Sequence, residues 1–281
     1  MQHSISQVAA LVVHGNAFLR GDDVPGFWPG NSTYRFCETV SFVTFSALGP
    51  HAYAPDPLRW FEQLRADGVL GLRLRYGASP LSRISDRMSV ALMGGGGSWI
   101  VETVKHGSLD EWRSEWKLGD RDHPQKKIWH VTYGRTREDG PLVAPRPGQS
   151  SVRGELTSTL AAVSQFAWRK ELDAFARLFD QALQALQSDD PLAGQFHSDL
   201  APAAALGLPS RQLLGAASAA WVFGGMGSWN DLGFEGVDGR TYEALSERLF
   251  AAIVRAIVEG ANGSFAVDVP APVSRPWWKL W

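Results

Sequence analysis

The sequence predicts an α+β fold, with an antiparallel sheet in the N-terminal half and a helical C-terminal half. Apolar side chains mostly recur at every second position before residue 140, which is typical of strands. After residue 152 they recur mostly at helical spacing. Residues 139–151 (DGPLVAPRPGQSS), rich in proline and glycine, cannot continue a helix or a central strand. We therefore predict a mainly antiparallel sheet region with one helix over residues 1–140 and a helical region over 152–281, as two domains or as parts of one composite domain.

The first predicted strand and the first predicted helix follow each other closely. Residues 33–45 carry apolar side chains on both parities, which indicates a strand that is buried on both faces or bends. Asp56 and Pro57 then have the residue types of an N-cap and a first helical position. Apolar residues spaced by three follow them, and Gly68 ends the pattern. We expect a short helix between Asp56 and Gly68.

Three further runs in this half have the pattern of strands. Residues 70–76 alternate between leucine or tyrosine on one face and arginine on the other. Residues 85–93 and 98–104 are interpreted as two more strands, joined across Gly94–Gly97. Those four glycines lack the spacing and the following helix of a dinucleotide-binding loop, so a hairpin turn is the favoured interpretation.

The tryptophan-rich segment 109–135 fits either a helix or a β-hairpin. Trp112 and Trp116 are four residues apart, as on one face of a helix, but the same stretch alternates charged residues with apolar or small ones. A hairpin closed by residues 119–126 would place Trp116 opposite Trp129. Cross-strand aromatic pairs contribute ~0.2–1 kcal/mol each, so we predict this hairpin in preference to the helix.

The second half contains three helical runs and an aromatic end. The first run, 155–187, is long enough for two helices that meet near Trp168. The second covers 211–223, with Ser210 as its cap, and is apolar nearly all round, which indicates a buried helix. The third, 241–259, is amphipathic. We expect the terminal Trp277, Trp278 and Trp281 to pack on the body of the protein or on a partner, because exposed indoles favour aggregation.

Charge, cysteine content and motifs exclude several classes of function. A net charge of −2 argues against a dominant nucleic-acid-binding surface. A single cysteine, Cys37, excludes an intramolecular disulfide and a cysteine-based zinc site. The GxSxG, HExxH, phosphate-loop, CxxC and EF-hand motifs are all absent from the sequence. We therefore predict no cofactor, no metal site and no nucleic-acid partner.

The N-terminal segment has neither the basic start nor the continuous apolar run of a signal peptide. The longest apolar stretch, residues 213–226, is too short to span a bilayer and is broken by glycines. These features predict a cytoplasmic protein that does not associate with a membrane.

A short pattern, GG-x-GSW, occurs at Gly94–Trp99 and again at Gly224–Trp229. In a chain with 29 glycines and 12 tryptophans, coincidence is the favoured explanation. The second copy leaves a buried helix and runs directly into Asn230 and Asp231, which either cap a turn or face a cleft. The residues we select as candidates for binding are Trp99, Trp112, Trp116, Trp229, Asn230 and Asp231, because tryptophan suits interface anchors.

Residues 220–262, which include AWVFGGMGSWNDLGF and YEALSERLFAAIVRAIVEGAN, resemble the C-terminal end of small bacterial toxin-immunity proteins. The resemblance implies a protein that binds a cognate toxin and occludes the toxin's active site, with no catalysis of its own. We therefore favour a protein-binding module. Two alternatives stay open: a hydrolase with a site near Asn230 and Asp231, and a glycan-binding protein that uses exposed tryptophans.

Overall fold

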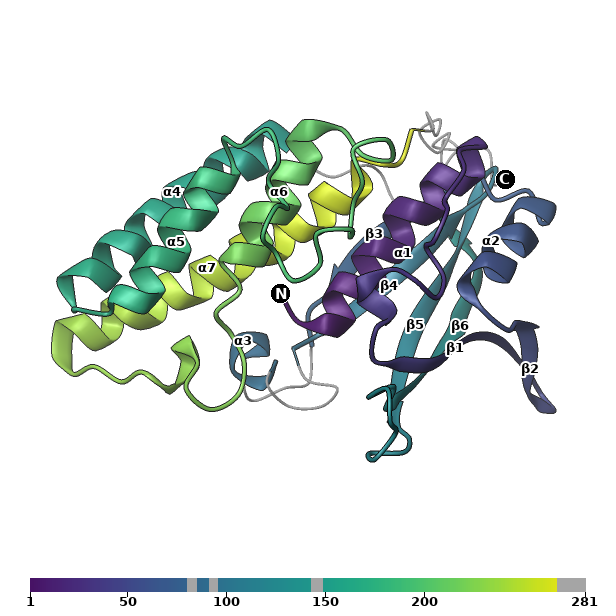
Figure 1. Ribbon diagram of the computed structural model, residues 1–281, viewed down its shortest axis with the longest axis horizontal. Coiled ribbons are helices and arrows are strands. Elements are labelled where there is room, and N and C mark those ends of the chain that lie inside the picture. The colour runs from purple at the N-terminus through teal and green to yellow at the C-terminus, as the bar shows by residue number, and fades with distance from the viewer. Residues whose placement is uncertain (80–84, 91–95, 143–148, 267–281) are drawn as a thin grey trace, which may run out of the picture.

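The computed structural model describes residues 1–79, 85–90, 96–142 and 149–266, and it confirms the α+β class (Figure 1). Strands from the N-terminal half form a six-stranded sheet in the order β2-β1-β6-β5-β4-β3. The strands are β1 Cys37–Ser46, β2 Gly49–Ala54, β3 Gly71–Gly77, β4 Ser98–Val104, β5 Ser108–Leu118 and β6 Trp129–Pro141. The predicted tail packing at Trp277, Trp278 and Trp281 lies outside the described residues.

The sheet is mixed, which corrects the prediction of an antiparallel sheet. Strands β1 and β6 run parallel, whereas all other neighbours in the sheet are antiparallel. A parallel pair needs a long crossover connection, and here the chain between β1 and β6 supplies β2, β3, β4 and β5. Alternation along a strand reports which face is buried but not which strand lies beside it, so the sequence pattern missed this pairing.

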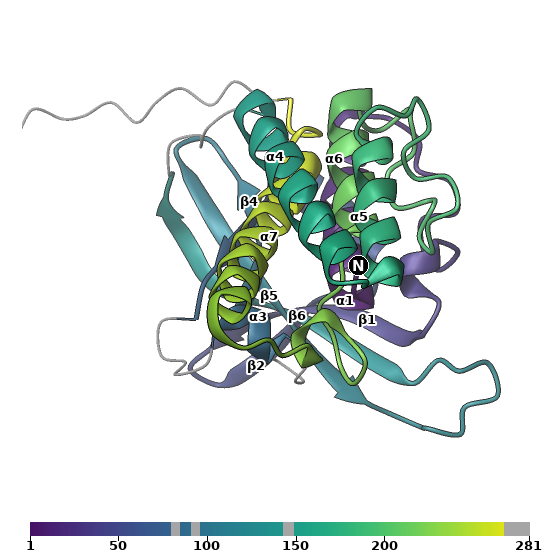
Figure 2. The same ribbon diagram turned by 90° about the vertical axis from the view of Figure 1, so that its left-hand side faces the viewer.

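Helices α1 and α2 lie against the sheet, and the helices of the C-terminal half form a group beside it (Figures 1 and 2). Helices α4, α5, α6 and α7 pack on one another, and both α1 and α7 contact β3 at the edge of the sheet. The predicted division of residues 155–187 into two helices near Trp168 is confirmed by α4 and α5. The helix bounds are α1 His3–Arg20, α2 Pro57–Ala66, α3 Asp86–Ser89, α4 Gln149–Arg169, α5 Asp173–Ala185, α6 Leu208–Ala219 and α7 Gly236–Asn262.

Helix α1 is the element that the sequence analysis missed, since it expected one helix in the first half. Every residue from Ile5 to Ala17 is buried. A helix covered on all sides carries no amphipathic stripe, so its period is hard to detect. Its polar side chains bond inside the protein: Gln7, for example, accepts a hydrogen bond from the Tyr133 hydroxyl and donates to the Thr33 carbonyl.

Two asparagines cap the outer edge of β3. The side chain of Asn16, on α1, donates to the Leu72 carbonyl at 2.9 Å and accepts from the Leu72 N–H at 2.7 Å. Asn262, the last residue of α7, makes the same pair of bonds to Leu74, at 2.9 and 2.6 Å. Each side-chain amide thus replaces the backbone of a missing neighbouring strand. The bonds satisfy an edge that would otherwise be open to pairing with another chain, and they attach both helices to the sheet.

Two predicted elements differ in position from those observed. Residues 85–93 were expected to form a strand, but residues 86–89 form the short helix α3 and residues 91–93 lie outside the described part. The side chain of Ser85 accepts a hydrogen bond from the Met88 N–H, and this cap favours a helical turn. Helix α6 begins at Leu208, with Gly207 rather than Ser210 as its cap, because Pro209 fits the first turn of a helix.

The predicted hairpin is present as β5 and β6, but its register is displaced by two residues. Trp116 pairs with Val131, and Leu118 pairs with Trp129. A displacement by two preserves which face each side chain occupies, so alternation alone cannot distinguish the two registers. Trp116 and Trp129 still make edge-to-face contact, with ring centroids 6.0 Å apart.

Burial lowers the pKa of three histidines, His3, His14 and His197, to about 4. The folded state therefore favours neutral imidazole, and between about pH 6.5 and pH 4 the unfolded chain binds more protons. We expect the free energy of unfolding to fall as the pH drops through this window. Urea denaturation at a series of pH values measures the slope.

A variant at His3 tests the origin of this slope. The ring of His3 lies against Phe36 and Trp116, so phenylalanine at this position keeps the aromatic packing but cannot titrate. We expect His3→Phe to flatten the pH dependence and the exposed control His106→Gln to leave it unchanged. The same slope in His3→Phe as in the unmodified protein would contradict this explanation.

Candidate functional site

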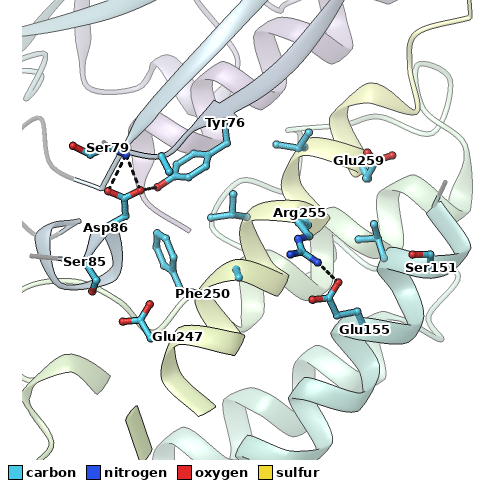
Figure 3. A pocket seen from close by; sticks show the side chains of 15 residues that line it. Tyr76, Ser79, Ser85, Asp86, Ser151, Glu155, Glu247, Phe250, Arg255 and Glu259 are labelled. Atoms are coloured by element: carbon cyan, nitrogen blue, oxygen red, sulfur yellow. Dashed lines mark hydrogen bonds and ion pairs between the residues drawn. The ribbon is translucent and has the colours of Figure 1, made fainter. Parts of the chain in front are cut away.

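A pocket of about 530 Å³ opens between the end of β3 and the helices α4 and α7 (Figure 3). The end of β3 and the start of α3 form one wall, the first turns of α4 form the opposite wall, and α7 forms the floor. Such a volume is in the range of ligand-binding pockets. The lining residues are Tyr76, Ala78, Ser79, Ser85, Asp86, Ser151, Val152, Glu155, Glu247, Phe250, Ala251, Val254, Arg255, Val258 and Glu259.

The floor of the pocket is apolar. Phe250, Val254 and Val258 are spaced by four residues along α7, which places them on one face of the helix. The small side chain of Ala251 lies next to this row and leaves room above it. An apolar ligand group that enters here would therefore move its surface out of water and onto apolar side chains, which favours binding.

One wall of the pocket carries two carboxylates. Asp86 lies 2.6 Å from the Tyr76 hydroxyl and accepts a hydrogen bond from the Ser79 N–H at 3.2 Å. Glu247 extends from α7 toward the same side of the pocket (Figure 3). Burial and the neighbouring Asp86 raise the pKa of Tyr76 well above its ordinary value, so the phenol stays a proton donor at neutral pH.

The opposite wall is closer to neutral. Arg255 on α7 donates to Glu155 on α4 at 2.6 Å, so these two charges compensate each other. Glu259 lies one turn further along α7. Among the described residues, four carboxylates and one guanidinium line the pocket, and two of these carboxylates, Asp86 and Glu247, lie on the wall away from the Arg255–Glu155 pair.

A buried arginine fixes the acidic wall. Arg87 on α3 is only 2% exposed, and its guanidinium donates to Glu243 at 2.5 Å, Glu247 at 2.9 Å and Asn230 at 2.8 Å. Asn230 returns a bond from its amide to the Arg87 carbonyl at 2.9 Å. The planar guanidinium suits several directed bonds at once. It therefore holds α3, and with it Asp86, against α7.

The first copy of the GG-x-GSW pattern contacts α3 and Val90, and the residue that follows the second copy also contacts α3. From the first copy, the Gly96 N–H donates to Ser89, and a Cβ at Gly96 would come within 2.7 Å of the Val90 side chain. Gly96 also has φ +83°, which glycine adopts without strain. The residue directly after the second copy is Asn230, which binds Arg87. Residues 94 and 95 of the first copy lie outside the described part of the chain.

Two of the residues predicted around the second copy, Trp229 and Asp231, make contacts that stabilise the fold. Trp229 is fully buried, with its indole N–H on Ser246 and its ring against Phe175 and Phe179. Asp231 accepts hydrogen bonds from the backbone of residues 227 and 228 as part of a capping box. Of this group, Asn230 alone reaches the wall of the pocket, and it does so through Arg87.

The other predicted tryptophans are spread over the sheet. Trp112 is 1% exposed and packs edge-to-face on Trp60, so its ring has no face free for a partner. Trp99 is half-buried and contacts Tyr76, which lines the pocket, but Trp99 itself does not line it. Trp116 is half-buried in the cluster around His3, and it lies on β5, the strand next to that of Trp99, at the same end of the sheet. The structure does not bring the six predicted residues together in one place.

Sequence reasoning missed Asp86, Arg87, Tyr76 and Glu247. Glu243 and Glu247 are four residues apart on one helix face, and Glu247 has no basic residue three or four positions away, which is the signal in the sequence that points to an outside cation. Nothing in the sequence indicates that Arg87 supplies it, because α3 was expected to be part of a strand.

Two absences concern the described part of the chain. Within residues 1–79, 85–90, 96–142 and 149–266, no group of three or more His, Cys, Asp or Glu side chains is arranged to hold a metal ion. None of the helices in these ranges has the length and apolar character needed to cross a bilayer. Comparison of the chain with protein-family models, with curated proteins and with solved structures finds no match.

The Arg87 contacts lead to a prediction. We expect Arg87→Met to lower the free energy of unfolding by about 1–3 kcal/mol, the range for hydrogen bonds to charged groups. Arg87→Lys should be almost as destabilising, because one ammonium cannot reproduce the fork of the guanidinium. Chemical denaturation measures both variants. Arg177→Met, at a side chain that is 61% exposed, is the control and should have no effect; full rescue by lysine would contradict the proposed role.

Proposed function

We propose that this protein is a protein-binding module and that the pocket between β3, α3, α4 and α7 receives part of its partner. One observation carries the proposal: the apolar floor lies on α7, and the carboxylates of the acidic wall lie on α3 and α7. Groups held on helices are already ordered before binding, which reduces the entropic cost of association. The described residues of the lining include no histidine and no cysteine.

The class of partner that we propose is a bacterial toxin. The segment that resembles immunity proteins, residues 220–262, includes α7 and therefore the whole floor of the pocket. It also includes Asn230, which supports the acidic wall through Arg87. In this proposal the protein acts in the cytoplasm as an immunity protein and occludes the active site of a cognate toxin.

Filling the pocket tests the proposal. We expect Ala251→Phe to occupy the space above the floor and to weaken toxin binding by about tenfold or more, as expected when an interface anchor loses its pocket. Ala244→Phe is the matched control, because Ala244 lies on the same helix, is exposed and does not line the pocket. Calorimetry with the purified product of a toxin-like gene directly upstream measures the affinity.

Growth provides a second readout of the same variants. Cells that express the toxin should grow when the unmodified protein or Ala244→Phe is co-expressed, and should not grow with Ala251→Phe. Circular dichroism checks that each variant is folded. Protection by folded Ala251→Phe equal to that by the unmodified protein would show that the pocket is not the binding site, and the absence of any toxin binding would overturn the function itself.

A further inference from the structure

Building on the proposed function, we infer that the pocket takes an arginine or lysine side chain of the partner, flanked by apolar residues. The basic group lies between Asp86 and Glu247, and the neighbouring apolar groups lie on the row of Phe250, Val254 and Val258. The occupant is thus a short basic and apolar segment of a protein, identified by its chemistry.

The charge of the two walls carries this inference. Arg87 is enclosed behind Glu243 and Glu247 and is 2% exposed, so it compensates these carboxylates from the protein side without presenting a positive charge to the pocket. Glu247 keeps 49% of its side chain exposed. Asp86 receives its hydrogen bonds from Tyr76 and Ser79, both of them neutral donors. Arg87 with Glu243, Glu247 and Asp86 carries one positive and three negative charges, so this wall keeps a net charge of −2 that no cation among the described lining residues balances.

The opposite wall excludes the alternative of an acidic ligand. Arg255 is the cation among the described lining residues, and its guanidinium is already directed at Glu155. A carboxylate that entered the pocket would meet Asp86 and Glu247, and the like charges would repel it. A basic side chain has the opposite sign, and its aliphatic stem is suited to the apolar floor.

Three blocked peptides that differ in one residue test the inference: acetyl-Leu-X-Leu-amide with X as Arg, Gln or Glu. Titration into the full-length, isotope-labelled protein, followed through the methyl signals of Val254 and Val258, reports binding in the pocket itself. We expect the Arg peptide to bind more tightly than the Gln peptide, by about twofold to fivefold for each partly exposed carboxylate contacted. The Glu peptide should bind most weakly.

Variants connect this preference to the named groups. Asp86→Asn and Glu247→Gln keep the shape of the side chains and an acceptor oxygen for their partners, and each should reduce the preference for Arg over Gln. Ala251→Phe should abolish the shifts for all three peptides, and Ala244→Phe should not. Equal binding of the Glu and Arg peptides, or no binding of the Arg peptide, would overturn the inference even if the toxin binds. If the Arg peptide binds but no toxin binds, the proposed function is overturned instead.

Discussion

Replacement of Trp229 by alanine is expected to lower the free energy of unfolding by about 3–5 kcal/mol, the range for a fully buried aromatic side chain. Its ring is 0% exposed and lies 5.2 Å from the rings of both Phe175 and Phe179. Its indole N–H donates to the Ser246 hydroxyl at 2.7 Å, so truncation leaves a cavity and removes the donor to this buried hydroxyl, which still donates to the Tyr242 carbonyl. Urea denaturation at neutral pH measures the loss.

Trp168 is the matched control for this variant. It is the same residue type, also lies in the helical half, and also donates its indole N–H, to Asp180 at 3.1 Å, but it is 45% exposed. We expect Trp168→Ala to cost less than about 1 kcal/mol, as for most surface substitutions. Similar losses at the two positions would show that Trp229 is not the centre of the helical core.

The edge of the sheet gives the second large effect. Asn16 is 3% exposed and satisfies both the N–H and the carbonyl of Leu72. Asn16→Ala leaves both groups buried without a partner, and each such group costs about 1–3 kcal/mol. We therefore expect a total loss of about 2–6 kcal/mol. Gln63→Ala, which removes an exposed amide that donates to Asp67, is the control and should change stability little.

An isosteric variant separates hydrogen bonding from packing at this position. Asn16→Asp keeps the volume but places a carboxylate oxygen opposite the Leu72 carbonyl, where the asparagine has its donor. We expect Asn16→Asp to be at least as destabilising as Asn16→Ala at neutral pH. Its deficit should shrink in acid, because a protonated carboxyl can donate to the carbonyl again. A stable Asn16→Asp protein at neutral pH would contradict the edge-capping role.

The parts of the fold that could be predicted are those whose local pattern reports burial. Helix α2 was expected from Asp56 and Pro57, and the Asp56 side chain does accept from the Arg59 N–H. The hairpin of β5 and β6 was expected from alternation, although its register was not. Helix α1 and the parallel pairing of β1 with β6 depend on contacts distant in sequence, and no local period encodes them.

The candidate site was harder to predict than the fold, because its groups come from four separate elements. Asn230 was selected as a candidate binding residue, and the sequence does not indicate its partner Arg87, which lies 143 positions away. Tryptophans were selected for their size and flatness, and Trp112 and Trp229 use these properties in the core instead. The space of the pocket depends on the small side chain of Ala251, and the sequence alone does not show that larger side chains surround this alanine.

The most direct test of the pocket as the binding site is hydrogen exchange of this protein with and without the purified toxin. We predict slower exchange in the complex at the end of β3, in α3 and in the first turns of α4, and no change in the hairpin around Trp116. Protection confined to that hairpin, with α3 and α4 unchanged, would contradict this prediction and place the interface on β5 and β6.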